Sequence, residues 1–244
     1  MSGDALVWIT GASSGIGRAL ADSVPWPGAE IMDVSRSGAE GLIHVAADLS
    51  DPSSWAEVGR SMAESVGSFA GERVVLIHCA ATLDPMVFAR DANPDEYTRA
   101  VLLNSAAPQV LGQAFVHAVR DRDVKADLVI LTSGASRTVY EGWSLYGPAK
   151  AAVDHWVRHV GEEELRRGSR CRVLAVAPGV VATPMQAQIR ATSEEDFPAG
   201  DRFRGLHERG ELRDPADAAR DVWTVVLDAT VPSGSVIDVR TMNR

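Results

Sequence analysis

The sequence predicts a single doubly wound α/β domain built on a parallel, seven-stranded sheet. Strand-length apolar runs alternate with longer helical stretches along the chain of 244 residues. Several runs are apolar at consecutive positions, as expected for strands covered on both faces. Alternation of strand and helix implies parallel strands joined by right-handed crossovers. The length suits one large domain, and without a repeat or a low-complexity linker we expect it to span residues 1–244.

Short apolar runs predict the seven strands. In chain order, the expected strands are Ala5–Thr10, Ala29–Ser35, Leu42–Ala46, Arg73–Cys79, Ala126–Ser133, Arg172–Ala177 and Ser235–Val239. Longer stretches predict the helices, which are Gly15–Ser23, Ser53–Ser68, Pro94–Arg122 and Tyr146–Arg167. We expect the third helix to bend or break at Pro108, because proline removes a helical hydrogen bond.

The segment from about Thr183 to Glu211 departs from this regular order. It is polar and charged, and Pro198 and Gly200 interrupt it. A segment of this length between a strand and a helix is typically a functional lid. We therefore expect residues 183–211 to cover a substrate.

Composition excludes several classes of partner. The chain carries 33 acidic and 24 basic residues, a net charge of −9, which argues against nucleic acid and anionic membranes. The start of the chain lacks a basic region followed by a long apolar run, and no apolar stretch approaches the length of a membrane span. Cys79 and Cys171 lie in strand-like runs, which favours free thiols over a disulfide. These features together predict a cytoplasmic protein.

A glycine-rich turn follows the first expected strand and opens the first helix. Gly11, Gly15 and Gly17 would let the backbone approach a pyrophosphate, and the helix N-terminus would direct N–H groups at it. Ser13, Ser14 and Ile16 lie in the same turn. The alternative is a tight turn without a ligand, but its position in a βαβ unit favours a dinucleotide site.

The end of the second strand bears on the choice between NAD and NADP. Asp33 follows the turn by about 20 residues, which by spacing alone suggests NAD bound through its ribose. We expect the strand to end instead at Ser35, which is followed by Arg36. A guanidinium there can hold a 2′-phosphate, so the sequence favours NADP(H). The alternative for Arg36 is a solvated surface residue.

Three side chains are placed for carbonyl chemistry. Ser133 ends the fifth strand, where side chains face the ligand crevice. Tyr146 and Lys150 share a helix face at i,i+4, although such spacing also arises by chance. The Lys150 ammonium and a positive nicotinamide ring should lower the pKa of the Tyr146 phenol by about two to three units from its usual value of about 10. Ser133 would hydrogen-bond the carbonyl, Tyr146 would donate the proton, and the cofactor would supply hydride.

The ordered set of motifs resembles the short-chain dehydrogenase/reductase family over almost the whole chain. It comprises Thr10–Gly17, Asp48-Leu49, Cys79-Ala80-Ala81, Asn104, Ser133, Tyr146 with Lys150, and Pro178-Gly179 with Thr183. The resemblance implies a Rossmann-type domain with a Ser–Tyr–Lys–Asn catalytic set. It also implies that the cofactor contacts Asp48, Leu49, Ala80, Ala81, Pro178, Gly179, Val181 and Thr183.

By the same resemblance, Asn104 holds a water that links Lys150 to solvent, Asp48 contacts adenine, and Thr183 lies near the nicotinamide carboxamide. One stretch departs from the family pattern. The family usually has Asn-Asn-Ala-Gly where this chain has His78-Cys79-Ala80-Ala81. We expect weaker hydrogen bonding in this turn, but small residues still leave room for the cofactor.

From Pro178 onward the chain resembles more narrowly the sepiapterin reductase and bacterial benzil reductase branch. That branch reduces carbonyls next to another carbonyl, in pterin side chains or aromatic diketones. The candidate substrate residues are Trp143, Met185, Gln186, Ile189 and Asp238. Trp143 could stack on a flat substrate, the three lid residues could form a wall, and Asp238 would anchor a pterin by resemblance. The alternatives are packing within the lid and, for Asp238, an ordinary polar residue of the last strand.

The sequence thus predicts an NADPH-dependent reductase of a small carbonyl compound. An alcohol dehydrogenase working in the oxidising direction and a non-catalytic NADP-binding regulator stay open as alternatives. His155 and His159 lie at i,i+4, but no third ligand accompanies them, so we expect no metal. The helices Pro94–Arg122 and Tyr146–Arg167 resemble the faces through which this family forms dimers and tetramers, and we expect a homodimer or homotetramer.

Overall fold

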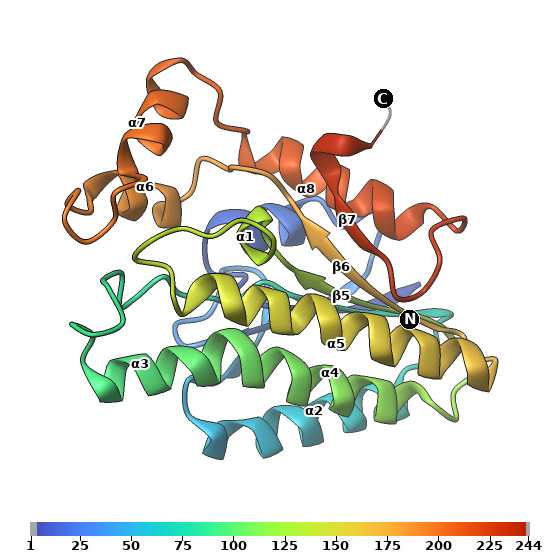
Figure 1. The fold of residues 1–244 in the computed structure, drawn as a ribbon. Coiled ribbons are helices and arrows are strands. Elements are labelled where there is room, and N and C mark those ends of the chain that lie inside the picture. Colours follow the sequence, from blue (N-terminus) through green and yellow to red (C-terminus); the bar gives the residue numbers. More distant parts are fainter. Residues whose placement is uncertain (1–3, 243–244) are drawn as a thin grey trace.

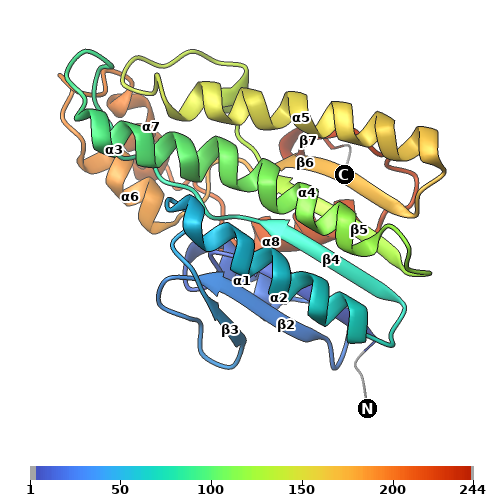
Figure 2. The same ribbon diagram turned by 90° about the horizontal axis from the view of Figure 1, so that it is seen from below.

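The computed structural model describes residues 4–242 and contains a parallel sheet between two layers of helices (Figures 1 and 2). The sheet has seven strands in the order β3-β2-β1-β4-β5-β6-β7, and every neighbouring pair is parallel. The strands are β1 (Ala5–Thr10), β2 (Glu30–Ser35), β3 (Ile43–Ala46), β4 (Arg73–His78), β5 (Lys125–Leu131), β6 (Cys171–Ala177) and β7 (Val236–Asp238). The predicted fold class is confirmed, and each predicted strand end lies within two residues of the observed one.

The helices cover both faces of this sheet. They are α1 (Gly15–Asp22), α2 (Trp55–Ser68), α3 (Pro94–Val101), α4 (Ala107–Val119), α5 (Tyr146–Arg167), α6 (Pro184–Ala191), α7 (Gly200–Glu208) and α8 (Pro215–Leu227). Helices α2, α4 and α5 lie on one face, and α1 and α8 lie together on the other (Figure 1). None of the helices between residues 4 and 242 is long and apolar enough to span a membrane.

The bend expected at Pro108 lies elsewhere. Helices α3 and α4 are joined by a π-helical segment, Leu102–Ala106, and Pro108 lies in the first turn of α4. A proline ring clashes with the carbonyl four residues earlier, which here belongs to Asn104. The distortion therefore falls in the turn before the proline, where a widened helix moves that carbonyl aside.

The sequence implied a helix after the lid but gave no bounds for it, and this helix is α8. Its start carries two ordinary helix signals, because the Asp214 side chain accepts a hydrogen bond from the Ala216 N–H and Pro215 occupies the first helical position. Trp223 and Val222 of this helix are buried against the sheet. The expected lid is also more regular than its composition indicated, since residues 183–211 contain α6 and α7, which pack together.

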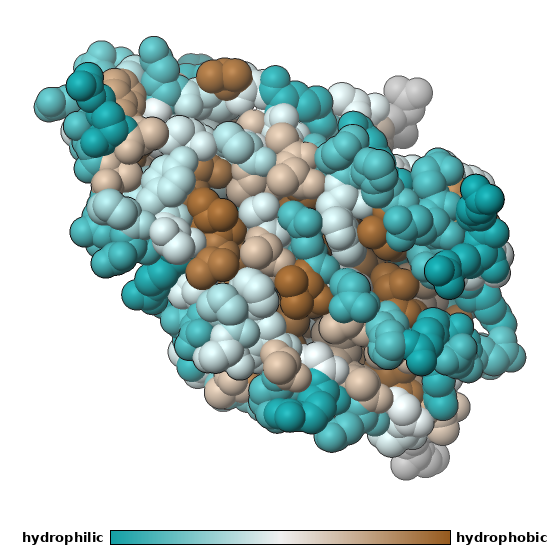
Figure 3. Space-filling view, turned by 60° about the horizontal axis from the view of Figure 1, so that its bottom comes forward, coloured by the Kyte–Doolittle hydropathy of each residue, from teal (hydrophilic) through white to brown (hydrophobic). Residues whose placement is uncertain are grey.

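The face formed by α3, α4 and α5 carries exposed apolar side chains. Figure 3 shows hydrophobic residues in the middle of this face with hydrophilic residues around them. Val101 and Val110 are each 41% exposed, and Leu165 is 53% exposed. This is the helical face that the sequence analysis associated with self-association.

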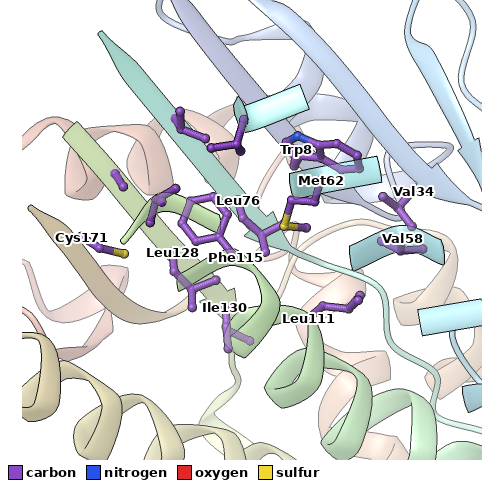
Figure 4. Packing of buried hydrophobic residues seen from close by; sticks show 14 of the residues in the cluster. Trp8, Val34, Val58, Met62, Leu76, Leu111, Phe115, Leu128, Ile130 and Cys171 are labelled. Atoms are coloured by element: carbon purple, nitrogen blue, oxygen red, sulfur yellow. The ribbon is translucent and has the colours of Figure 1, made fainter. Parts of the chain in front are cut away.

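Two apolar layers, one on each side of the sheet, form the core around the strands, and a third apolar cluster lies under the lid. Alternate residues of one strand serve different layers, so Trp8 of β1 packs toward α2 and α4 while Ile9 packs toward α1 and α8. In Figure 4, Phe115 of α4 points at Leu76 and Leu128 of neighbouring strands. Burial on both faces accounts for the continuous apolar runs in the sequence and holds the strand ends rigidly in place.

Candidate active site

A cavity of about 950 Å³ lies at the carboxyl ends of the strands, between the glycine turn and the lid helices. Two predicted site residues, Asn104 and Asp238, do not line it. All the others do, namely Gly11, Ser13, Ser14, Gly15, Ile16, Gly17, Arg36, Asp48, Leu49, Ala80, Ala81, Ser133, Trp143, Tyr146, Lys150, Pro178, Gly179, Val181, Thr183, Met185, Gln186 and Ile189. Ligand sites in such sheets lie at this edge.

Two positions in the glycine turn after β1 leave little room for a side chain. Gly11 has φ +73°, and a Cβ at this position would lie 3.2 Å from the Cα of Ala80. A Cβ at Gly17 would lie 2.3 Å from the carbonyl oxygen of Gly11. The Ser14 side chain forms no capping hydrogen bond with α1, so it does not satisfy the N–H groups of the first turn. This cradle fits the pyrophosphate of a dinucleotide.

Asp33 has a structural role under this turn. It is fully buried, and its carboxylate accepts hydrogen bonds from the Ala12 N–H at 3.0 Å and from Ser35 Oγ at 2.6 Å. Strand β2 ends at Ser35, as predicted, and the next residue, Arg36, lines the cavity. Spacing alone would assign the Asp33 carboxylate to a ribose hydroxyl, but this carboxylate is already hydrogen-bonded to Ala12 and Ser35.

Asp48 lies at the same end of the cavity. Its carboxylate accepts hydrogen bonds from the N–H and the hydroxyl of Ser50, at 3.0 and 2.7 Å. The hydrogen bond from the Ser50 hydroxyl is the main cause that lowers the pKa of Asp48 below its usual value, and the bond from the Ser50 N–H acts in the same direction. Arg99 of α3 lies 3.5 Å from the carboxylate and also lines the cavity. Sequence reasoning missed Arg99, which is brought here only by the packing of α3.

Ser133, Tyr146 and Lys150 converge on the centre of the cavity. Ser133 follows β5 and Tyr146 begins α5, and the two side chains are hydrogen-bonded. The Lys150 ammonium donates to the carbonyl oxygen of Leu131 at 2.8 Å and lies 5.6 Å from the centre of the Tyr146 ring. Burial lowers the pKa of Lys150 to about 8, so the group is largely protonated at neutral pH.

The expectation that Lys150 lowers the pKa of Tyr146 was wrong for the protein alone. Burial raises the pKa of the Tyr146 hydroxyl to about 12, and the hydrogen bond with Ser133 offsets only part of this rise. The Lys150 ammonium donates its hydrogen bond to the Leu131 carbonyl. Desolvation of the phenolate therefore outweighs the nearby positive charge.

The turn after β4 is held by two side chains from other elements. Thr10 Oγ1 accepts from the N–H groups of Cys79 and Ala80, each at 3.0 Å. The Asn104 amide accepts from the Thr82 N–H at 2.9 Å and donates to the Thr82 carbonyl at 2.8 Å. The weaker hydrogen bonding expected in this turn is thus compensated. The Asn104 side chain supports the turn and does not face the cavity.

His78, the first residue of the unusual turn, is buried to 2% exposure. Neither ring nitrogen has a hydrogen-bond partner among the described residues. Burial lowers the pKa of this imidazole to about 3, so it is neutral and acts as a packing residue. Both cysteines are free, as expected, and Cys79 borders the cavity.

The predicted substrate residues divide into two groups. Trp143 lines the cavity but is only 6% exposed, since it stacks on Phe197 at 4.7 Å and contacts the Tyr146 ring at 5.4 Å. The residues of α6, Met185, Gln186 and Ile189, line the cavity from the lid side. Packing within the lid and contact with a substrate are therefore compatible for these residues.

Asp238 lies outside the cavity lining. It is 6% exposed, and its carboxylate accepts from Arg240 Nη2 at 2.6 Å and from Arg137 Nη2 at 3.3 Å. Hydrogen bonds from Arg240 hold the pKa of Asp238 below its usual value. The carboxylate is thus occupied by two guanidinium groups and is not presented to a ligand.

Sequence reasoning also missed three residues on the substrate side of the cavity. Tyr140, Arg202 and Arg240 line the substrate side, from the loop before α5, from α7 and from the segment after β7. No local pattern marks them, because each comes from a different part of the chain. Within residues 4–242, no cluster of three metal-ligating side chains occurs, and His155 and His159 contact each other at 3.1 Å.

Comparison with known proteins places these motifs in a family. The model of the short chain dehydrogenase family matches residues 5–194. A benzil reductase ((S)-benzoin forming) of Bacillus subtilis is 32% identical, covering 95% of this chain and 97% of that protein. A sepiapterin reductase of Meriones unguiculatus is 30% identical, covering 97% and 96%. The crystal structure of the KRED1-Pglu enzyme has a TM-score of 0.80 at 28% identity, covering 95% and 99%.

Proposed function

The chain belongs to the short-chain dehydrogenase family, and from this premise we propose that it is an NADPH-dependent carbonyl reductase acting on a 1,2-dicarbonyl compound. Members of this family are oxidoreductases that act on small molecules with a nicotinamide cofactor. One observation carries the proposal. Ser133, Tyr146 and Lys150 line the same cavity as the glycine turn, so a carbonyl group and a dinucleotide can meet there.

In this proposal Tyr146 donates the proton. The cofactor supplies the hydride that adds to the carbonyl carbon. The Ser133 hydroxyl hydrogen-bonds the carbonyl oxygen and stabilises its developing negative charge. The Tyr146 hydroxyl then transfers its proton to that oxygen. The Lys150 ammonium stabilises the phenolate that remains.

The pKa of Tyr146 favours reduction over alcohol oxidation. Burial keeps this phenol protonated at neutral pH, since its pKa is about 12. A reductase needs a proton donor at this position, whereas an alcohol dehydrogenase needs a base. The protein therefore meets a carbonyl substrate in the correct protonation state, and a regulator without turnover would not need the Ser133–Tyr146 pair.

The surroundings of Arg36 favour NADP(H) over NAD(H). Asp33 is engaged with Ala12 and Ser35, so no carboxylate is free at the end of β2 to receive a ribose hydroxyl. Arg36 lines the cavity at this point. A guanidinium pairs well with a phosphate through parallel hydrogen bonds. The NADP 2′-phosphate supplies such a partner.

A diketone is favoured over a pterin as the substrate. The names of the relatives include both benzil and sepiapterin reductases. Asp238, the residue expected to anchor a pterin, is held by Arg137 and Arg240. The aromatic rings of Tyr140 and Trp143 border the cavity and suit the rings of a compound such as benzil.

We also propose that two or four chains associate through the α3–α4 and α5 face. The exposed Val101, Val110 and Leu165 side chains on these helices support this arrangement. Burial of such side chains between subunits is favourable. Light scattering should give a mass of two or four chains, and the mass of one chain would contradict the assembly.

The direct test is oxidation of NADPH in the presence of benzil. We expect wild type to consume NADPH and Tyr146→Phe to lose about 100-fold or more of this rate, because only the proton donor is removed. Tyr97→Phe is the matched control, since the Tyr97 hydroxyl donates to the Ser144 carbonyl at 3.4 Å and Tyr97 is not among the residues that line the cavity. Retained NADPH binding, measured by fluorescence, shows that the Tyr146 variant is folded. Equal rates in the two variants would refute the assigned proton donor.

A further inference from the structure

Resting on the proposed function, we propose that the physiological substrate carries a carboxylate and that Arg202 binds this group. The substrate would then be a ketone or diketone whose acidic substituent is separated from the reacting carbonyl by an apolar or aromatic segment. Four features of the cavity lead to this inference.

The first feature is the state of Arg202. This residue lies in the first turn of α7, and its Nη1 donates to the Tyr140 hydroxyl at 2.6 Å. Among the described residues, Arg202 forms no ion pair. Its neighbour Asp201 pairs with Arg204 at 2.7 Å instead. A positive side chain in the first turn of a helix opposes the helix dipole, so Arg202 does not serve to stabilise the start of α7.

The second feature is a surplus of positive charge around Asp238. Two guanidinium groups, those of Arg137 and Arg240, share this single carboxylate. Arg240 lines the cavity, and the methylene groups of its side chain pack over Gly179, 3.3 Å from where a Cβ would lie. Its Nη2 lies 3.5 Å from where a Cβ would lie on Gly134, which is the residue after Ser133. The guanidinium is therefore next to the reacting end of the cavity.

The third feature is the charge of the cavity as a whole. The chain has a net charge of −9, yet basic residues outnumber acidic ones in this lining. The basic residues are Arg36, Arg99, Lys150, Arg202 and Arg240, and the acidic ones are Asp48, Asp84 and Glu96. The proposed cofactor accounts for Arg36 at the end of β2, Arg99 of α3 lies against Asp48, and Lys150 belongs to the catalytic set. On the substrate side, Arg240 pairs with Asp238, whereas Arg202 has no such explanation.

The fourth feature is a row of aromatic rings between the proton donor and Arg202. The Tyr146 ring contacts Trp143 at 5.4 Å, and Trp143 contacts Tyr140 at 5.0 Å. Arg202 lies over the Tyr140 ring at 5.8 Å and donates to its hydroxyl. A substrate lying along these rings would have its carbonyl at Tyr146 and its far end at the guanidinium. The planar guanidinium matches a carboxylate through two parallel hydrogen bonds.

The test compares benzil with benzil-4-carboxylate, which has the same reacting dicarbonyl and one added charge. We expect wild type to favour the carboxylate about tenfold or more in kcat/KM, mainly through a lower KM, because the charge acts in binding. Arg202→Gln should reduce this preference at least fivefold, and Arg202→Lys should retain part of it. Arg166→Gln, an exposed change in the last turn of α5, is the matched control and should leave the preference unaltered.

A binding measurement separates this inference from the proposed function. Calorimetry with benzil-4-carboxylate and NADP⁺, which cannot reduce it, should show binding that weakens with KCl and is lost in Arg202→Gln. If benzil is reduced but the carboxylate gives no preference, or Arg202→Gln leaves the preference unchanged, the carboxylate site is refuted and the reductase stands. If neither diketone is reduced while Arg202-dependent binding persists, the reductase falls and the anion site stands.

Discussion

Replacing Thr10 by valine removes a single oxygen that holds the turn beside the glycine cradle. Thr10 is fully buried, and its Oγ1 accepts from the N–H groups of Cys79 and Ala80, each at 3.0 Å. Valine keeps the shape of the side chain but cannot accept a hydrogen bond. Two N–H groups then lose their partner in a half-buried place, at about 1–3 kcal/mol each. Because water can reach part of this turn, we expect the free energy of unfolding to fall by about 2–3 kcal/mol.

Thr132 provides the matched control for this change. It lies just after β5 and is 4% exposed, and its Oγ1 has no hydrogen-bond partner among the described residues. Thr132→Val therefore removes a buried hydroxyl that bonds nothing, and the free energy of unfolding should stay the same or rise.

Urea unfolding followed by tryptophan fluorescence measures both variants, and an unchanged m-value shows that the comparison is valid. Thr10→Val should also raise the KM for NADPH, since Ala80 lines the cavity against Gly11. If the free energies of unfolding of Thr10→Val and Thr132→Val agree within about 0.5 kcal/mol, the role assigned to the Thr10 oxygen is refuted.

Three further predictions concern the cofactor and the catalytic charge. Arg36→Gln should lower the preference for NADPH over NADH about 10- to 100-fold, because it removes one charge-assisted hydrogen bond to the 2′-phosphate. Unchanged kcat/KM values for the two cofactors would contradict this role of Arg36. Gly17→Ala should abolish NADPH binding in a fluorescence titration, because the new Cβ would lie 2.3 Å from the Gly11 carbonyl oxygen, and Gly67→Ala, which has open space around it, is the control. The rate of benzil reduction should fall as the pH rises through about 8, which is the pKa of Lys150. Deprotonation of Lys150 removes the charge that stabilises the Tyr146 phenolate, whereas Tyr146 itself stays protonated up to about pH 12. A rate that is flat to pH 10 would exclude Lys150 as the source of this charge.

The altered pKa values of Tyr146 and Lys150 have a common cause. Both groups are buried, and burial penalises whichever form is charged, so the phenol pKa rises and the ammonium pKa falls. The two pKa values therefore shift in opposite directions. The Tyr146 hydroxyl stays protonated at neutral pH, whereas the Lys150 ammonium titrates near it. A bound cofactor with a positive ring would favour the Tyr146 phenolate, so the spectroscopic pKa of Tyr146 should be lower with NADP⁺ than without it.

Most of the cavity could be predicted from the sequence, since it is built from strand ends. The turn at Gly11–Gly17 lies between a strand and a helix that each have a clear local pattern. Ser133 follows a strand, and Tyr146 with Lys150 follows the rule for one helix face. When the strands are identified within two residues, their carboxyl ends are placed at the same edge of the sheet. The residues on those ends then meet without further information.

The parts that could not be predicted depend on partners that are distant in the sequence. Asp238 was expected to face a ligand, but it pairs with Arg137, 101 positions earlier. The bond between Arg202 and Tyr140 joins residues 62 positions apart. Thr10 and Asn104 support one turn from different elements, and the Lys150 ammonium is directed at the Leu131 carbonyl. None of these contacts leaves a periodic signal in the chain.

The sequence by itself therefore determined the fold class, the glycine cradle and the Ser133–Tyr146–Lys150 set, because hydrophobic periodicity and turn residues act over short stretches of chain. Only the tertiary structure decided which carboxylates are engaged and where positive charge is left unpaired. The pKa values of the catalytic pair were also decided there. These properties depend on the distance and burial of groups brought together by packing. A hydrogen bond or an ion pair responds to that distance and burial and not to separation along the chain.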